Sequence, residues 1–302
     1  MNREADPGVR LAGEEPCMLG ESPFWSPESQ RLYYCDIPAH LLYRFDPASG
    51  EREQWGFDCE IGSIAPTRNG GLLLAMRDGL WRFDTRSGYC ALLADPPYNP
   101  AHERFNDGKC DPQGRFWVGT LYEPRDPPLA SLHCFSDDAF ERKADGVTVS
   151  NGLAWSPDGA TMYWSDTTAH EIAAFDFDGT TGGIRDRRVF ARFPRRQPGQ
   201  DPATYGGRPD GAAVDAEGCY WVAMFEGQRL LRLSPQGELL REVILPVRCP
   251  TMPCFGGADL KTVYITTARA GRPSGELAEQ PWAGCLLALD VEVPGLPVNA
   301  FR

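Results

Sequence analysis

Long hydrophobic runs and a basic surface are both absent from this sequence. No stretch approaches the 18 consecutive apolar residues that suggest a membrane-spanning helix, so we expect no contact with a membrane. The first ten residues, MNREADPGVR, lack the apolar run of a secretory signal. The formal net charge of −12 argues against nucleic acid as a partner, because binding to phosphates needs a basic surface. Small substrates and cations are compatible with this charge.

Several common site motifs are also missing. The ten cysteines are spread along the chain without a CxxC pair, which excludes a standard zinc site and predicts buried free thiols. Together with the lack of a signal, this favours a cytoplasmic protein. The four histidines show no HxxxH or HxH spacing. No GxSxG, GxGxxG or GxxxxGK motif is present, so neither a serine nucleophile elbow nor a nucleotide loop is supported.

What the sequence does contain is a repeat of a polar turn followed by a β-rich run. The six copies are SPESQRLYYCD at 26–36, TRNGGLLLAM at 67–76, DPQGRFWVG at 111–119, SPDGATMYWSD at 156–166, DAEGCYWVA at 215–223 and GADLKTVYIT at 257–266. A second phrase follows each copy, and most of these read as a strand, a hairpin turn and another strand. The copies recur about every 40–60 positions, which is the range of propeller blades.

The repeat therefore predicts an all-β fold, a single six-bladed β-propeller over residues 1–302. Short strands also build sandwiches and barrels, but six matched copies without helical segments favour the propeller. Residues around 11–19 are expected to supply a strand that closes the last blade.

The innermost strand of each blade lines the central tunnel, so equivalent positions in the six copies should face one another. The residues just before the six turns are Trp25, Ala65, Cys110, Trp155, Val214 and Phe255. Four positions earlier in each copy stand the residues that we call the tunnel ring: Glu21, Ile61, Asn106, Asn151, Asp210 and Thr251. Five of the six carry a side-chain oxygen, and two of these are carboxylates.

Facing carboxylates repel each other and are costly to desolvate, and a divalent cation resolves both problems. The oxygen ligands suit Ca²⁺, Mg²⁺ or Mn²⁺, and Zn²⁺ also accepts carboxylates. We therefore predict one divalent metal ion (Ca²⁺, Zn²⁺, Mn²⁺, Mg²⁺ or Fe²⁺) in the central tunnel. The alternative is that these polar residues only hydrogen-bond strand ends or tunnel waters.

From about residue 16 to residue 290 the chain resembles the SMP-30/gluconolactonase/regucalcin (LRE-like) family. The resemblance is carried by LGESPFW at 19–25, DIPAHLLYRFD at 36–46, RFNDGKCDPQGRFWVGT at 104–120, SNGLAWSPDG at 150–159, RPDGAAVDAEGCYWVA at 208–223 and CFGGADLKTVYITTAR at 254–269. It implies metal-dependent hydrolysis of a sugar lactone, such as an aldonolactone, to the aldonic acid.

The resemblance also implies roles for individual residues. Glu21, Asn151 and Asp210 would bind the metal, and Arg104 and Asn106 would contact the substrate. Glu123 lies near a further substrate-contacting position, in a loop that matches the family less well. The expected partner is a small-molecule lactone, bound by a monomer.

We expect Asp210 to be the catalytic base, because no histidine falls in the tunnel ring. Alternatively, Arg104 pairs with a surface carboxylate, and Asp107 is expected to cap a turn. The Pro- and Gly-rich residues 195–211 read as a long loop that shapes specificity as a flap, or as an idle surface insertion. Alternative functions are a related propeller esterase or phosphotriesterase, and a calcium-binding propeller without catalysis.

Overall fold

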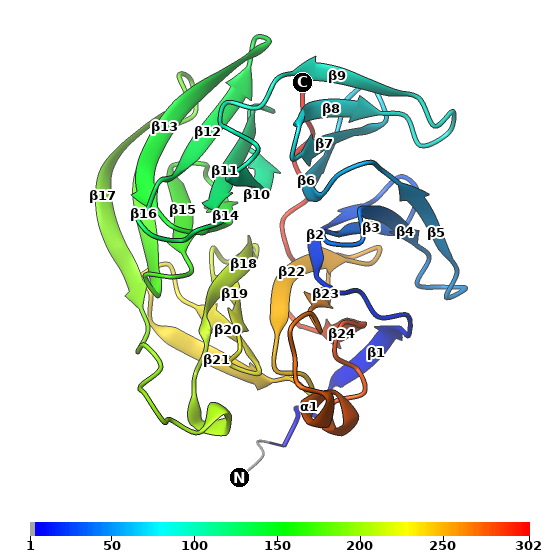
Figure 1. Cartoon of the computed structure of the whole chain (residues 1–302), viewed down its shortest axis with the longest axis vertical. Coiled ribbons are helices and arrows are strands. Elements are labelled where there is room, and N and C mark those ends of the chain that lie inside the picture. Colours follow the sequence, from blue (N-terminus) through cyan, green and yellow to red (C-terminus); the bar gives the residue numbers. More distant parts are fainter. Residues whose placement is uncertain (1–3) are drawn as a thin grey trace.

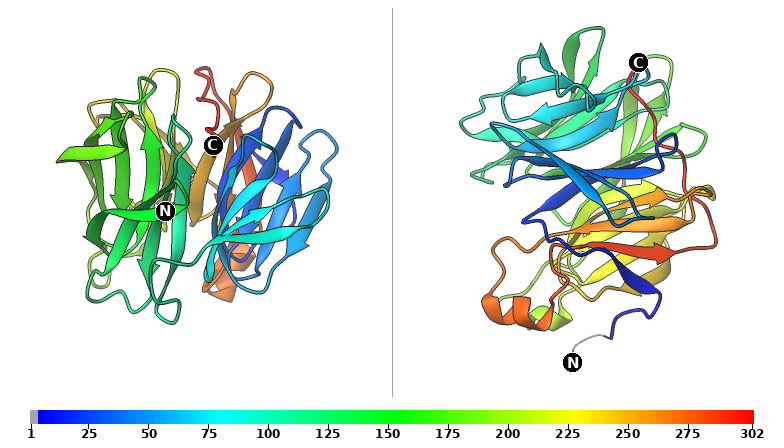
Figure 2. Two further views of the ribbon diagram at one scale, coloured as in Figure 1. Left: turned by 90° about the horizontal axis from the view of Figure 1, so that it is seen from above. Right: turned by 90° about the vertical axis from the view of Figure 1, so that its right-hand side faces the viewer.

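The turns and β-rich runs of the repeat form six four-stranded antiparallel sheets in the computed structural model, which describes residues 4–302. Figure 1 shows the sheets arranged as blades around a central axis, and the side views of Figure 2 show their strands stacked into a thick disc. The predicted six-bladed all-β propeller is confirmed.

The first three blades follow the repeat directly, from the innermost strand outward. Blade one contains β2 (Gly20–Ser26), β3 (Arg31–Asp36), β4 (Leu41–Phe45) and β5 (Arg52–Gly56). Blade two contains β6 (Ile61–Pro66), β7 (Leu72–Met76), β8 (Gly79–Phe83) and β9 (Cys90–Ala94). Blade three contains β10 (Glu103–Cys110), β11 (Phe116–Tyr122), β12 (Ala130–Ser136) and β13 (Ala139–Val147).

The last three blades keep the same order. Blade four contains β14 (Ser150–Trp155), β15 (Thr161–Asp166), β16 (Glu171–Asp178) and β17 (Gly183–Arg192). Blade five contains β18 (Arg208–Val214), β19 (Tyr220–Phe225), β20 (Arg229–Leu233) and β21 (Leu239–Ile244). Blade six contains β22 (Pro250–Gly256), β23 (Thr262–Thr267), β24 (Leu286–Asp290) and β1 (Val9–Gly13).

The N-terminal strand closes the ring, as predicted, but within different bounds. β1 pairs with β24, and Val9 lies opposite Leu289. The strand stops at Gly13 rather than running to residue 19, because the exposed segment Glu14–Pro16 follows it. Two acidic residues and a proline without an N–H group do not continue a sheet ladder.

The expectation of no helical segments is wrong in two short places. The 3₁₀ turn η1 (Pro202–Thr204) lies between blades four and five, and α1 (Ser274–Glu279) lies between β23 and β24. An ion pair of 2.7 Å between Arg272 and Glu276 spans the start of α1 at the favourable i, i+4 spacing. Neither segment, nor any other helix in the described part of the chain, is long and apolar enough to cross a membrane.

The hydrophobic core is divided among the six blade interfaces. Six clusters of buried apolar side chains are present, and each draws its members from two adjacent blades. Trp117 and Trp221 are among the largest fully or nearly fully buried side chains, and each packs in a cluster between two blades. All ten cysteines are free thiols, eight of them buried.

A C-terminal strap, residues 294–302, crosses one end of the tunnel. The Gly295 backbone pairs with Asp215 in blade five. The N–H groups of Phe301 and Arg302 donate to carbonyl oxygens of blades two and three, at 2.8 and 3.0 Å. In Figure 1 this red segment runs past the centre to end beside blade two. The strap therefore links blades that are not neighbours in the ring.

Two blades share a buried aspartate at the start of their repeated turn. In blade three, the Asp111 carboxylate accepts backbone N–H groups of the turn, the Trp117 indole N–H at 2.9 Å and the Arg115 Nε at 2.6 Å. Asp215 repeats the arrangement in blade five, where it accepts the indole N–H of Trp221 at 2.9 Å. The repeated phrase thus encodes a buried polar network as well as a turn.

We expect Asp111→Ala to lower the free energy of unfolding by about 3–5 kcal/mol, because it leaves the Arg115 guanidinium buried without its counter-ion. Urea denaturation measures this. Ser156→Ala changes the equivalent position in blade four, where a hydroxyl group serves the turn, and should cost about 1 kcal/mol. Equal losses in the two variants would contradict the argument.

Candidate metal centre and active site

The tunnel ring lies where each innermost strand is irregular. The pairing of all six innermost strands with their neighbours shifts register at or beside the ring position, for example between Glu21 and Phe24 and between Pro209 and Ala212. A bulge of this kind re-aims a side chain out of the regular alternation. In blade one the residue after Glu21, Ser22, is buried and has a left-handed φ of 50°, a conformation that non-glycine residues avoid without local support.

A chain of hydrogen bonds fixes the two amide groups of the ring. The Arg104 Nη1 donates to the Asn106 Oδ1 at 2.9 Å, and the Asn106 Nδ2 donates to the Asn151 Oδ1 at 2.9 Å. The Asn151 Nδ2 donates in turn to the Thr167 hydroxyl at 2.8 Å. These bonds determine which atom of each amide is the oxygen. The Asn151 oxygen keeps a second lone pair available for a cation.

The two carboxylates of the ring are buried and influence each other. Glu21 and Asp210 are 8% and 6% exposed. Burial and the nearby charges of Asp210 and Asp107 hold the pKa of Glu21 well above its usual range. Burial raises the pKa of Asp210 to about 8, although the Arg208 charge opposes the shift. Both shifts mean that the negative charges lack sufficient compensation from the protein itself.

A divalent cation fits this donor set. The ring offers two carboxylates and an oriented amide oxygen, which are hard ligands. Asp107 adds a nearby carboxylate whose Oδ1 is buried without a hydrogen-bond donor. Within residues 4–302 no three His, Cys, Asp or Glu side chains form a ready metal cluster, so the site depends on the amide as well as on the acids.

The other predicted residues have different surroundings. The Thr251 hydroxyl donates to the Gly20 carbonyl at 2.6 Å, so this group is already used in a hydrogen bond to the backbone. Ile61 is apolar and offers no ligand atom. Glu123 pairs with Arg77 at 2.7 Å, and Arg77 also holds Glu60. Arg104 lies beside the ring and forms no ion pair within the described residues, unlike the alternative in which it pairs with a surface carboxylate.

In blade three, Asp107 has a different role from the one predicted, and the half-buried Lys109 was not anticipated from the sequence. Asp107 does not cap a turn of its own blade: it accepts the Leu153 N–H of blade four at 3.0 Å. Lys109 donates from its Nζ to the Ala212 carbonyl of blade five at 2.7 Å, so its side chain spans from one blade to the next but one. Their position in the NDGK segment, directly after Asn106, was the available signal.

The loop before Asp210 is shorter than predicted. β18 begins at Arg208, so residues 208–211 are strand rather than loop. The segment that remains is tied down at several points: the Arg248 Nη1 donates to the Pro202 carbonyl at 2.7 Å, and the Arg229 Nε donates to the Gly206 carbonyl at 2.8 Å. The Tyr205 hydroxyl lies 3.3 Å from the His170 Nε2. Its role as a flap stays a prediction.

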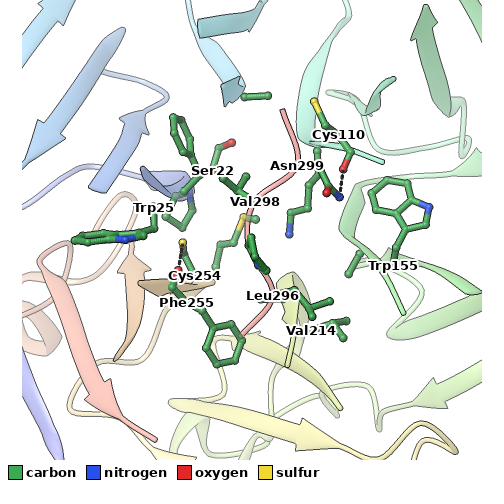
Figure 3. Close-up of a pocket in the computed structure, with 18 of the residues that line it drawn as sticks. Ser22, Trp25, Cys110, Trp155, Val214, Cys254, Phe255, Leu296, Val298 and Asn299 are labelled. Carbon is green, nitrogen blue, oxygen red and sulfur yellow. Dashed lines mark hydrogen bonds between the residues drawn. The ribbon is translucent and has the colours of Figure 1, made fainter. Parts of the chain in front are cut away.

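A cavity lies next to the ring, beside the C-terminal strap. It has a volume of about 300 Å³ and is lined by residues that follow the ring positions on the innermost strands, together with Leu296–Asn299 of the C-terminal strap. Figure 3 shows these side chains around the strap, where the Asn299 amide donates to the Cys110 carbonyl at 3.2 Å. No ring residue lines this cavity, so it is separate from the candidate metal centre.

Comparison with known proteins agrees with the sequence motifs. A model of the SMP-30/gluconolactonase/LRE-like region matches residues 19–269. The chain is 44% identical to a 6-deoxy-6-sulfogluconolactonase of Pseudomonas putida, over 97% of this chain and 98% of the relative. It is 35% identical to regucalcin of Bos taurus, over 94% of each chain.

Among solved structures, a calcium-binding protein, regucalcin, of Agrobacterium tumefaciens superposes with a TM-score of 0.89 and 26% identity, over 97% of each chain. A family match over most of the chain and relatives of this identity and coverage confirm the predicted resemblance. The chain belongs to the SMP-30/gluconolactonase/LRE-like family.

Proposed function

We propose that this protein is a metal-dependent lactonase that hydrolyses a sugar lactone to the corresponding aldonic acid. The observation that carries the proposal is the convergence of two buried, insufficiently compensated carboxylates with an oriented pair of amides in the tunnel. The names of relatives, which include a sulfogluconolactonase and a gluconolactonase, support the reaction class.

Glu21, Asn151 and Asp210 are the residues that would hold the metal. When bound, a divalent ion supplies Lewis acidity toward a carbonyl oxygen. Thr167 has a supporting role, because its hydroxyl accepts from the Asn151 amide and donates to the Pro209 carbonyl at 2.7 Å. It thereby ties the orientation of one ligand to the residue that precedes another.

Asp210 would act as the base. As a water oxygen bonds to the lactone carbonyl carbon, the Asp210 carboxylate takes a proton from that water. The C–O bond of the lactone ring then breaks, and the leaving oxygen takes the proton back. Arg104 and Asn106 would hold substrate oxygens, and Glu123 is a further candidate at the rim.

A calcium-binding propeller without catalysis is the second candidate, favoured by the relatives named regucalcin. Metal binding without hydrolysis of any lactone would support it. An esterase or phosphotriesterase of the same fold would prefer apolar esters. The polar side chains of Asn106 in the ring, and of Arg104 and Glu123 near it, favour a sugar lactone over such substrates.

We expect Asp210→Asn to lower kcat on aldonolactones by about 10²–10⁴-fold, because the variant loses the proton acceptor. Glu21→Gln should lose both bound metal and activity. The assay is hydrolysis of a lactone panel, before and after chelation and after adding back each divalent ion. Asp176→Asn, which changes an exposed carboxylate in blade four, is the matched control. Full activity of Asp210→Asn would remove the proposed base.

The raised pKa of Asp210 predicts how the metal-free protein responds to pH. Its ordinary value is 3.8 and its folded value about 8, so between these values the folded state keeps a proton that the unfolded state has lost. Stability should therefore fall as the pH rises from about 4 to about 8. Thermal unfolding in chelator at several pH values tests this.

A saturating divalent ion should raise the Tm and weaken this pH dependence, since it replaces the proton at the carboxylates. Asp210→Asn should also show a weaker dependence in chelator. A chelated wild-type protein that gains stability over the same pH range would contradict the site as described.

A further inference from the structure

A second layer of side chains surrounds the tunnel two residues before the ring. In chain order it consists of Leu19, Cys59, Arg104, Val149, Arg208 and Cys249. The Arg104 Nη1 donates to the Asn106 Oδ1 at 2.9 Å, and the Arg208 charge acts on Asp210, so each arginine lies close to the ring residue two positions later. They are the only charged members of the layer, on blades three and five. Arg208 is thus the counterpart of Arg104, which the family resemblance associates with the substrate.

The surroundings of Arg208 hold it in place but leave donors available. Its Nη2 lies 3.2 Å from the Glu226 Oε2, and its guanidinium carbon lies 5.3 Å from the centre of the Phe225 ring. Its Nε is buried without an acceptor. The side chain keeps 26% exposure, so a ligand entering the tunnel can reach it. The Arg208 charge also lowers the pKa of Asp210, which agrees with their closeness.

The network behind Arg208 carries more positive than negative charge. Glu226 also pairs with Arg272, Arg272 pairs with Glu276, and Glu276 pairs with Arg248. The three arginines Arg208, Arg248 and Arg272 therefore share two glutamates, so the network as a whole carries one excess positive charge. Arg195 and Arg196, on the adjacent loop, form no ion pair within the described residues. This local excess contrasts with the net charge of −12 for the whole chain.

We infer that Arg208 contacts the substrate and selects lactones that carry an anionic substituent away from the lactone carbonyl. The inference rests on the proposed function. Two residues along a strand span about 7 Å, so a substrate whose carbonyl carbon lies at Asp210 presents its far end to Arg208. A guanidinium with free donors binds the oxygens of a phosphate, sulfonate or carboxylate through charge-assisted hydrogen bonds.

The experiment compares kcat/KM for glucono-1,5-lactone with kcat/KM for lactones of the same skeleton that carry a 6-phosphate, a 6-sulfonate or a 6-carboxylate. The wild-type protein should prefer at least one anionic lactone by about tenfold or more, and the arm with the largest ratio identifies the substituent. Arg208→Gln should reduce the ratio of anionic to neutral kcat/KM by about 10–100-fold. Arg208→Lys should keep part of the preference, and added salt should weaken it.

Arg188→Gln is the matched control, because Arg188 is an exposed arginine paired with Asp176 on the outer side of blade four. Its ratio should equal that of the wild type. If the wild type hydrolyses neutral and anionic lactones equally well, or if Arg208→Gln loses the same factor on both, the inference is wrong and the lactonase proposal stands. If no lactone is hydrolysed, both are wrong.

Discussion

The burial of two like-charged carboxylates at one level of the tunnel is the constraint on which the rest of the site depends. Glu21 and Asp210 come from blades one and five, and the neighbouring Ser22 N–H and Arg208 charge offset their burial only in part. Their pKa values are raised because each is desolvated and because negative charges lie nearby. A fold would not retain such a pair for stability alone, since neutral side chains would be cheaper to bury there. The pair is therefore stronger support for the candidate site than the size of any cavity is.

The propeller can accommodate buried carboxylates at its axis because its apolar cores lie elsewhere, between the blades. The hydrophobic clusters lie between blades, so the innermost strands can present polar side chains to the tunnel without disturbing the packing. The register shifts at the ring then direct one side chain per blade toward the axis. The strap and β1 hold the ring closed from the two ends of the chain. Rigid blades thus position groups that are far apart in the sequence.

The sequence was sufficient for the blades and for the ring, because both follow from one linear repeat. The amide pair Asn106 and Asn151 could be placed together by counting residues, and their contact at 2.9 Å agrees with that count. Contacts that break the sixfold pattern could not be found in this way. The strap has no counterpart in any other blade, and α1 is an insertion into only one of them. The position of Arg208 beside the ring was not predicted either, because the Pro and Gly content of the stretch that precedes it indicated a loop rather than the start of β18.

Lys109 explains how three carboxylates can coexist near the axis. Asp107 influences the pKa values of both Glu21 and Asp210, so the region holds three acidic groups rather than two. The Lys109 ammonium lies close enough to Asp107 to lower its pKa, against the opposing effect of burial. Lys109 therefore offsets part of the charge of the third carboxylate, while the raised pKa values of Glu21 and Asp210 indicate that their own charges are compensated only in part. The lysine that crosses from blade three to blade five thus acts as a counter-ion for Asp107, and the proposed divalent metal would compensate the other two carboxylates.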